Sequence, residues 1–310
     1  MLYAITYSDD HYMRSSRLNL WTAKHIGKAD IILRYGPCDL DIDFKEQNSK
    51  IILQKRGAGY WLWKPYIILK TLQIASFGDY IMYMDAGAFY VRSIRCLIRQ
   101  LEVDQEDILL SSSLFPNRHW CKRDAFILMD CDKEEIANEH QVEAGYLLLK
   151  KTEVNIKFIT EWLDYMCDER ISTDCPNTQK KENYRGFRGN RHDQTVLSLL
   201  CRKHCIQPYK GLSDSSEITP FLINPKYFSA MGYSIDELEK FAYEEYNSPG
   251  YKNSKYKRII VNCRARRQGI FPLAYYILKS LKIALLVDHY RDKNKQDIID
   301  RYLNTECEDN

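Results

Sequence analysis

An acidic residue at the end of an apolar, strand-like run is the first feature of this sequence that could do chemistry. The run YIMYM leads directly into Asp85, which two small residues, Ala86 and Gly87, follow. In open α/β sheets, ligands bind beyond the carboxyl ends of the strands. A carboxylate there can hold a divalent cation or stabilise charge that develops on a substrate. A structural alternative also exists, because Asp and Gly are common in turns.

Two later motifs also place polar side chains beside small residues or at the start of a helix. In the segment VEAG, Glu143 precedes an alanine and Gly145, which are small enough to let a ligand approach the backbone. In RHDQ, Asp193 stands between His192 and Gln194 at the start of an apolar helical pattern. Glu143 is the candidate for a carboxylate beside a reacting carbon. Asp193 has the alternative role of a helix N-cap.

The segment RGAGYWLWKP combines cations, glycines and aromatic rings immediately before a predicted helix. Arg56 and Lys64 flank the glycines and rings, and cations beside a helix N-terminus suit the charge of a diphosphate. Trp61 and Trp63 can stack on a sugar or a base. Aromatic residues at this spacing also build cores, and the sequence leaves both possibilities open.

Together these residue types fit the transfer of a sugar from a nucleoside diphosphate. The leaving diphosphate develops negative charge, which a divalent cation, Lys, Arg or a helix N-terminus can stabilise. The sugar passes through an oxocarbenium-like state that needs a carboxylate or an amide nearby. We expect both groups beyond the carboxyl ends of strands.

The elements that must position these residues alternate along the first half of the chain, which is typical of an α/β sheet wound with helices. We predict strands at residues 2–6, 31–34, 80–84, 107–111, 145–150 and 258–261. We predict helices at residues 18–25 and 65–75, a third that Thr152 caps and that continues to residue 166, and a fourth from residue 193. The polar stretch 168–192 lacks periodicity, and a loop of this length is usually functional or disordered.

Three of these motifs resemble, in their order and separation, those of family 8 glycosyltransferases of the GT-A type. MDAG resembles the DxD element of that family, VEAGYLLLKKT its NAG or NSG strand, and RHDQTVLSLL its DQD segment. RGAGYWLWKP is similar to a segment of bacterial enzymes of capsule and O-antigen assembly. The resemblance spans roughly residues 1–205. It implies a GT-A-like, Rossmann-like sheet that is mixed and mostly parallel, with flanking helices and a helical C-terminal extension.

The resemblance also implies roles for single residues. It makes Asp85 a ligand of a divalent cation, Mn²⁺ or Mg²⁺, although Gly87 stands where the family has a second acid. It has Asp193 hydrogen-bond the donor sugar and Gln194 face the reactive carbon. The expected catalytic residues are Glu143, Asp193 and Gln194, and the expected donor-binding residues are Thr6, Tyr7, Arg56, Trp61, Lys64, Asp85, Ala86, Gly87, Gly145 and His192.

Composition and charge exclude several classes of protein. With 45% hydrophobic and 28% charged residues, the chain is too apolar for a disordered protein. The 45 basic and 42 acidic residues give a net charge of +3 without a basic stripe, which argues against a nucleic-acid partner. No apolar run reaches the ~20 residues that a transmembrane helix needs.

The N-terminus and the ten cysteines favour a cytoplasmic location. The opening MLYAITYSDD has neither the basic nor the apolar region of a secretory signal, and the irregular cysteine spacing is consistent with reduced thiols. Cys201, His204 and Cys205 lie close together on a predicted helix, but no second ligand pair accompanies them. We therefore favour a structural role for these three residues over a zinc site.

The C-terminal part forms a second expected unit. We expect a catalytic domain over residues 1–240 and a helical extension over residues 241–310. The apolar run 271–287 carries Lys279 and Lys282 on one side of a helix. Such a segment can lie on an anionic membrane surface or pack on the catalytic domain, and we prefer packing.

The sequence thus predicts a hexosyltransferase that uses a nucleotide-sugar donor, such as a UDP-sugar. The predicted acceptor is a glycan or lipid-linked oligosaccharide of a bacterial surface polysaccharide, which would fit peripheral contact with the inner face of the membrane. Two alternatives stay open. One is a nucleotidyltransferase, although TYSDDHY lacks the glycine-rich basic loop that such enzymes need. The other is a non-catalytic relative that binds glycans or acts as a scaffold.

Overall fold

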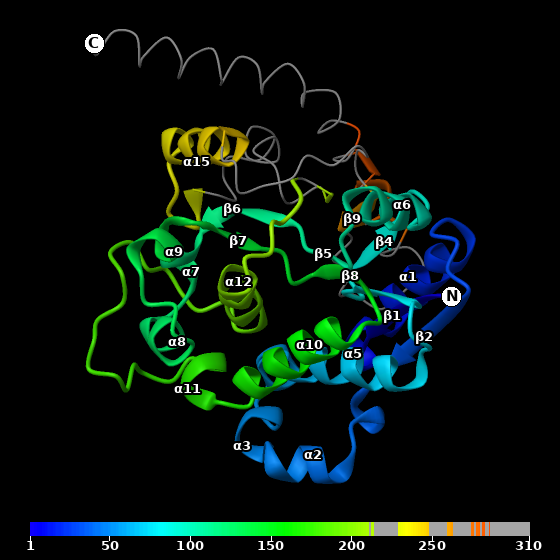
Figure 1. The fold of residues 1–310 in the computed structure, drawn as a ribbon, viewed down its shortest axis with the longest axis horizontal. Coiled ribbons are helices and arrows are strands. Elements are labelled where there is room, and N and C mark those ends of the chain that lie inside the picture. The colour runs from blue at the N-terminus through cyan, green and yellow to red at the C-terminus, as the bar shows by residue number, and fades with distance from the viewer. Residues whose placement is uncertain are drawn as a thin grey trace, which may run out of the picture.

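A five-stranded mixed sheet with helices on both faces forms the core of the protein (Figure 1). The computed structural model describes residues 1–210, 212–213, 229–247 and 259–262, and beyond them residues 274–275, 277–279, 281–282 and 285. The strands of the central sheet are β1 (Leu2–Tyr7), β2 (Ile31–Tyr35), β3 (Tyr80–Met84), β5 (Ile108–Leu109) and β8 (Tyr146–Lys150). They follow the spatial order β2-β1-β3-β8-β5.

The direction of the strands decides which of their ends meet. β1 is parallel to β2 and β3, whereas β8 is antiparallel to both β3 and β5. β1 and β3 therefore end at the edge of the sheet where β8 begins. The pairing of Met84 with Tyr146 places the residues that follow β3 beside those that precede β8.

Alternate residues of each strand pack against different helices, because strand side chains alternate between the two faces of a sheet. The main helices are α1 (Met13–His25), α5 (Trp63–Ile74), α6 (Arg95–Asp104), α10 (Glu153–Met166) and α12 (Asp193–Lys203). Ile81 and Leu147 face α5, α10 and α12, whereas Met82 and Leu148 face α1 and α6. Both faces are thus covered, which explains why the strands read as continuous apolar runs.

Two small sheets and several short helices surround this core. One small sheet pairs β4 (Ala88–Tyr90) with β9 (Ile260–Asn262), and the other pairs β6 (Ser112–Pro116) with β7 (His140–Val142). The short helices are η1 (Asp10–Tyr12), η2 (Pro37–Asp39), α2 (Ile42–Gln47), α3 (Ser49–Ile52), α4 (Gly57–Tyr60), α7 (Asn117–Trp120), α8 (Arg123–Leu128), α9 (Glu134–Asn138) and α11 (Glu169–Ser172). A longer helix, α15 (Ile235–Asn247), lies against β6 and is drawn in yellow in Figure 1.

Helix α10 shows how local sequence specifies an element. The hydroxyl of Thr152 accepts a hydrogen bond from the backbone N–H of Asn155 at 3.2 Å, which satisfies one of the donors that a helix N-terminus leaves open. The predicted cap is thereby confirmed. Phe158, Trp162 and Met166, spaced at helical intervals, are buried against α5 and α12.

The fold class and most of the predicted strands are confirmed. The sheet is mixed and mostly parallel, and strands occupy the predicted positions 2–6, 31–34, 80–84 and 145–150. The predicted strand at 107–111 is shorter than expected, because only Ile108 and Leu109 pair with β8 before the chain leaves the central sheet to form β6. The strand expected at 258–261 is observed as Ile260–Asn262.

Two of the four predicted helices begin earlier than the sequence indicated. The helix expected at 18–25 starts at Met13, and the helix expected at 65–75 starts at Trp63. Pro65 consequently lies in the first turn of α5, where its missing N–H has no helical partner to lose. The polar stretch 168–192 contains only the short helix α11 and is otherwise irregular.

The expected boundary between residues 240 and 241 falls inside α15, and β9, from the expected extension, pairs with β4. Of the apolar run 271–287, only some positions belong to the described residues. Ile277 packs against Phe89 and Val261, while Leu278 and Leu285 are exposed. Among the described residues, no helix has the length and apolarity to cross a membrane.

Candidate active site

The candidate site lies at the edge of the sheet where β1 and β3 end and β8 begins. Asp85 directly follows β3, and its backbone N–H donates to the carbonyl oxygen of Gly145 at 2.7 Å. Helix α12 begins at Asp193, and the first turn of α5 contributes Lys64. The residue after β3, the turn before β8 and the N-terminus of α12 therefore meet at one place, although they are far apart in the sequence.

Lys64 joins these three segments. Its ammonium group donates to the carbonyl oxygen of Ala144 at 2.8 Å and forms ion pairs with Asp193 and, at 3.3 Å, with Asp85. Its side chain is only 2% exposed. A buried ammonium is stable only among acceptors, and the three acceptors here match its three N–H donors. Lys64 thus holds the carboxylates of Asp85 and Asp193 close to each other.

Asp85 is fixed in place but stays accessible. One carboxylate oxygen accepts a hydrogen bond from the hydroxyl of Tyr83 and contacts Lys64. The amide of Asn19 donates to the backbone carbonyl of Asp85 at 3.1 Å, which ties the turn after β3 to α1. The other carboxylate oxygen lies 3.6 Å from where a Cβ at position 145 would be. The Asp85 side chain is 43% exposed, and because Gly145 has no side chain, this oxygen stays open to a ligand.

The electrostatics of the buried pair keep it charged at neutral pH. Burial raises the pKa of Asp193 to about 6, and the positive charge of Lys64 opposes this rise. Burial also disfavours the ammonium of Lys64, but the attraction of Asp193 and Asp85 outweighs burial and raises the pKa of Lys64 above its ordinary value. Burial and the charge of Asp85 raise the pKa of Tyr83 well above 10, so its hydroxyl stays a neutral donor.

Two cavities open on either side of Asp85. The larger has a volume of about 690 Å³, within the range of small-molecule sites. Tyr7 and Trp63, whose rings stack at a centroid distance of 3.9 Å, both contribute to its wall. The remaining lining residues come from the loop after β1, the segment 55–61, the turn after β3 and the end of β9: Ser8, Asp9, His11, Tyr12, Lys55, Gly57, Ala58, Trp61, Ala86, Gly87 and Asn262.

The smaller cavity has a volume of about 220 Å³ and shares two lining residues, Trp61 and Asp85, with the larger one. Its wall is built mainly from the turn before β8 and the N-terminus of α12. The other lining residues are Arg56, Lys64, Ala144, Gly145, Asn190, Arg191, His192, Asp193 and Gln194. Asp85 and Trp61 therefore stand at the junction of the two cavities, which together form one cleft.

A left-handed segment, residues 57–61, runs between the two cavities. All five residues have positive φ angles, between 51° and 93°. Three of them, Ala58, Tyr60 and Trp61, carry side chains, and left-handed backbone costs such residues roughly 1–2 kcal/mol each. The indole N–H of Trp63 donates to the carbonyl oxygen of Gly57 at 2.9 Å and helps to hold the segment. Strain of this kind is typical of ligand-binding loops.

We expect Gly57→Ala to disturb the cleft more than a glycine change elsewhere. A Cβ at position 57 would lie only 2.3–2.6 Å from the ring of Trp61, so this ring has to move. Urea unfolding should show a loss of about 1–3 kcal/mol, and a nucleotide, if the cleft binds one, should bind more weakly. Gly78→Ala is the matched control, because Gly78 also has positive φ but a Cβ there meets nothing within 4 Å. Equal nucleotide affinity in the two variants would contradict the prediction.

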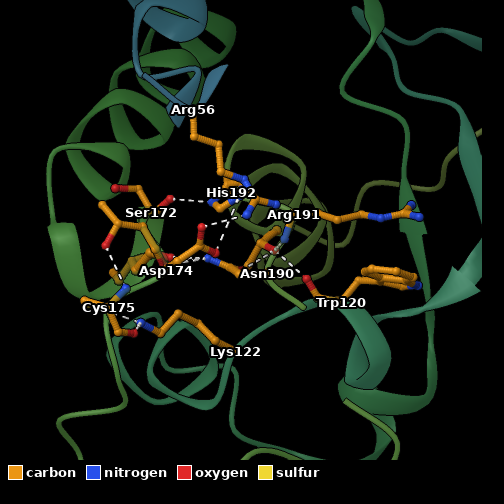
Figure 2. Close-up of polar contacts among 12 residues, drawn as sticks. Arg56, Trp120, Lys122, Ser172, Asp174, Cys175, Asn190, Arg191 and His192 are labelled. Atoms are coloured by element: carbon orange, nitrogen blue, oxygen red, sulfur yellow. Dashed lines mark hydrogen bonds and ion pairs between the residues drawn. The ribbon is translucent and has the colours of Figure 1, made fainter. Parts of the chain in front are cut away.

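Two residues that line the smaller cavity, Arg56 and His192, belong to a network of charged and polar groups (Figure 2). Arg56 and His192 converge on Asp174, with an ion pair of 2.8 Å from Arg56 and a separation of 3.8 Å from His192. Burial lowers the pKa of His192 to about 4, so the ring is neutral at pH 7. Its Nδ1 lies 2.9 Å from the carbonyl oxygen of Ser172 and therefore carries the ring hydrogen, which leaves Nε2 as an acceptor.

The structure brings most of the sequence-predicted site residues into this cleft, but not Glu143 or Thr6. The backbone N–H of Glu143 donates to Ser111 at 2.7 Å, and its side chain does not line either cavity. Thr6 is fully buried one residue before Tyr7, which does line the larger cavity. Because strand side chains alternate, neighbouring positions at a strand end face different ways.

Two further expectations need correction. Lys64 does not offer its charge to the open cavity, because its three donors are used by Ala144 and the two aspartates. Asp193 is not the N-cap of α12. His192 occupies that position with a φ of 51°, and Asp193 is the first helical residue.

Sequence reasoning missed several residues of the cleft. His11 lines the larger cavity, although no motif surrounds it in the sequence. Lys55 lies next to Arg56 in the same basic segment, so the RGAGYWLWKP pattern could have indicated it. Arg191 is the first residue of the RHDQ motif and Asn190 directly precedes it, and both line the smaller cavity.

The cleft does not fit a divalent cation well. Asp85 is followed by Ala86 and Gly87, which have no ligand side chains. Among the described residues, no group of three His, Cys, Asp or Glu side chains could hold a metal ion. An ion bound to Asp85 would lie roughly 5 Å from the ammonium of Lys64, where repulsion between the two cations is on the order of several kcal/mol.

The cysteines and histidine near the end of α12 have other contacts. His204 pairs with Glu161 at 2.6 Å, and the thiol of Cys201 donates to the carbonyl oxygen of Ile206 at 3.2 Å. Cys205 is exposed. These contacts agree with the structural role that we favoured.

Comparison with known proteins gives structural neighbours only. No protein-family model and no curated protein sequence matches the chain. The chain is similar to mouse xyloside xylosyltransferase 1, with a TM-score of 0.36 and 11% identity over 66% of this chain and 81% of that protein. It is similar to the glycosyltransferase GlyE of Streptococcus pneumoniae, with a TM-score of 0.40 and 14% identity over 94% of this chain and 63% of GlyE.

A third neighbour is the galactosyltransferase LgtC, solved in complex with donor and acceptor sugar analogues. Its TM-score is 0.33, with 15% identity over 64% of this chain and 70% of LgtC. At these scores the likeness concerns the fold alone, and activity has to be argued from the residues of the cleft. The chain has an α/β fold with a mixed, mostly parallel central sheet, and its structural neighbours are GT-A glycosyltransferases.

Proposed function

We propose that the protein is a glycosyltransferase that moves a sugar from a nucleoside diphosphate to an acceptor. One observation carries this proposal: two cavities of unequal size meet at Asp85 and Trp61. The larger, of about 690 Å³, has room for a nucleoside diphosphate, and the smaller, of about 220 Å³, has room for a sugar ring. The bond between phosphate and sugar then lies beside the carboxylate of Asp85.

The larger cavity supplies contacts that suit a nucleotide. The stacked rings of Tyr7 and Trp63 offer an aromatic surface for a base. Lys55 lines the same cavity and can offset the charge of the diphosphate, and the ring of His11 can donate a hydrogen bond there. In this proposal Lys55 takes the role that the sequence suggested for Lys64.

The smaller cavity supplies polar groups for a sugar. Asp193 and Gln194 line it at the start of α12, together with His192. The amide of Gln194 is oriented by a hydrogen bond of 2.9 Å to the side chain of Gln141. The accessible carboxylate oxygen of Asp85 stabilises positive charge on the sugar carbon as the bond to phosphate breaks.

The finer assignment is also part of the proposal. We propose a hexosyl donor such as a UDP-sugar and a glycan or lipid-linked acceptor in the assembly of a bacterial surface polysaccharide. Its support is the similarity of RGAGYWLWKP to a segment of capsule and O-antigen enzymes, together with the residues that this segment contributes to both cavities.

A panel of nucleotide-sugars tests the proposal. Many sugar transferases hydrolyse their donor slowly when no acceptor is present, so incubation with UDP-, GDP-, ADP- and CMP-sugars should release one nucleotide above the background rate. Calorimetry should show that the same nucleotide binds. Release of pyrophosphate from a nucleoside triphosphate would instead favour a nucleotidyltransferase, and glycan binding without nucleotide binding would favour a scaffold.

A further inference from the structure

We propose that the donor diphosphate binds without a divalent cation, because Lys64 provides the positive charge that neutralises the carboxylates beside it. The proposal rests on the proposed function, since it concerns how that donor is held. It also departs from the family resemblance, which implies Mn²⁺ or Mg²⁺ at Asp85.

The positive charge of Lys64 already lies between the two carboxylates. The ammonium of Lys64 lies 3.3 Å from a carboxylate oxygen of Asp85 and also pairs with Asp193. It thereby occupies the place between two carboxylates where an ion would otherwise bind. Burial fixes it there, because only 2% of the side chain is exposed and all three N–H donors have acceptors.

Asp85 offers few ligand atoms to a cation. The oxygen of Asp85 nearest to Lys64 already accepts from the hydroxyl of Tyr83, so only its other oxygen faces the cleft. The adjoining Ala86 and Gly87 add no ligand side chains. A cation at this oxygen would rely on a single protein carboxylate and would be repelled by the nearby ammonium.

The fixed charges of the cleft decide whether it repels or attracts a diphosphate. Without Lys64, two adjacent carboxylates would repel the phosphates. With Lys64 in place, one of the two negative charges is cancelled, and Lys55 and Arg56 lie on the cavity walls to attract the donor. The chain thus carries fixed cations where a metal-dependent site would recruit a soluble one.

Two titrations of the wild-type protein test this. UDP, with GDP and ADP in parallel, is titrated by calorimetry once in EDTA and once in MnCl₂. We expect the nucleotide that binds to show dissociation constants within about twofold of each other, whereas a site that needs metal should lose at least about tenfold in EDTA. Mn²⁺ is also titrated alone and with nucleotide, with electron paramagnetic resonance reporting the free ion. We expect no Mn²⁺ to bind with the nucleotide at a stoichiometry near one.

The variants Lys64→Met and Lys70→Met separate the role of this lysine from that of the helix. Both residues lie on α5, but Lys70 pairs with Asp41 at the surface. We expect Lys64→Met to bind UDP at least about tenfold more weakly in EDTA and to recover affinity when Mn²⁺ is added. Lys70→Met should behave as wild type. If Lys64→Met does not fold, the wild-type titrations still show whether nucleotide binding needs a divalent cation.

The outcomes are distinguishable. Loss of wild-type nucleotide binding in EDTA with recovery in MnCl₂ overturns the inference but supports a donor site. Stoichiometric binding of Mn²⁺ that Asp85→Asn removes also overturns it. If no nucleoside diphosphate binds in either buffer, the proposed function itself fails. Equal binding in both buffers, with weakened binding in Lys64→Met, supports the inference and the proposed function together.

Discussion

Asp85→Asn should lower the rate of sugar transfer, or of donor hydrolysis, by about 10²- to 10³-fold, which is ~3–4 kcal/mol in the barrier. The substitution keeps the size of the side chain and can still accept the hydrogen bond from Tyr83. It removes the negative charge that faces the junction of the two cavities. Because the side chain is 43% exposed, the free energy of unfolding should change by less than about 1 kcal/mol.

The control for this substitution is Asp41→Asn. Asp41 is also exposed and also paired with a lysine of α5, Lys70, but it lines neither cavity. The Asp41→Asn substitution should leave turnover unchanged. Rates and nucleotide dissociation constants, measured together for both variants, separate an effect on chemistry from one on binding. Turnover close to wild type in Asp85→Asn would remove Asp85 from the proposed mechanism.

The parts of the fold that the sequence predicts well are those with strong local patterns. β1, β3 and β8 read as continuous apolar runs because both faces of the sheet are covered, and α10 carries a cap and a regular apolar face. Weak patterns fail. β4 has only three residues and its partner β9 lies more than 160 positions away in the sequence, so no local window contains the information that makes β4 a strand.

The residues of the candidate site divide in the same way, into those that a local motif marks and those whose role depends on contacts between distant segments. The MDAG and RHDQ motifs correctly indicated that Asp85 and Asp193 line one cleft. Asp85 follows a strand and Asp193 begins a helix, and both of these elements have clear sequence patterns. The role of Lys64 was not predictable in this way. Its main partner, Asp193, is 129 residues away, and only the tertiary structure shows that its charge is used inside the protein. Glu143 lies outside both linings for a similar reason, since the direction of its side chain depends on the pairing of its backbone with Ser111.

The largest effect on stability should come from Lys64→Met. This change leaves the carboxylate of Asp193, which is only 9% exposed, without its positive partner. Breaking a buried ion pair from one side typically costs about 3–5 kcal/mol, because the remaining charge stays desolvated. Chemical denaturation should therefore show a large loss at neutral pH. Asp193→Asn alone should cost less, because Lys64 keeps Asp85 and the carbonyl oxygen of Ala144 as partners.

The stability loss in Lys64→Met should depend on pH, and the pKa of Asp193 determines the direction of that dependence. The folded-state pKa of Asp193 is about 6, above its ordinary value of 3.8, so the folded protein binds the proton more tightly than the unfolded chain does. Such a group contributes stability that is full below pH 3.8 and is lost as the pH rises through 6. Removing Lys64, which opposes the rise, should move the folded-state pKa still higher. The deficit of Lys64→Met should therefore be smaller near pH 5 than near pH 8.

A double-mutant cycle isolates the pair from other effects of the methionine. In Lys64→Met/Asp193→Asn no buried carboxylate remains at position 193, so the extra loss between about pH 5 and about pH 8 should disappear. The double variant should also be more stable than Lys64→Met alone at the higher pH, which independent effects cannot produce, since those would add. Additive losses with the same pH profile in both variants would mean that Asp193 does not depend on Lys64. In that case the buried lysine would not be the charge around which the cleft is organised.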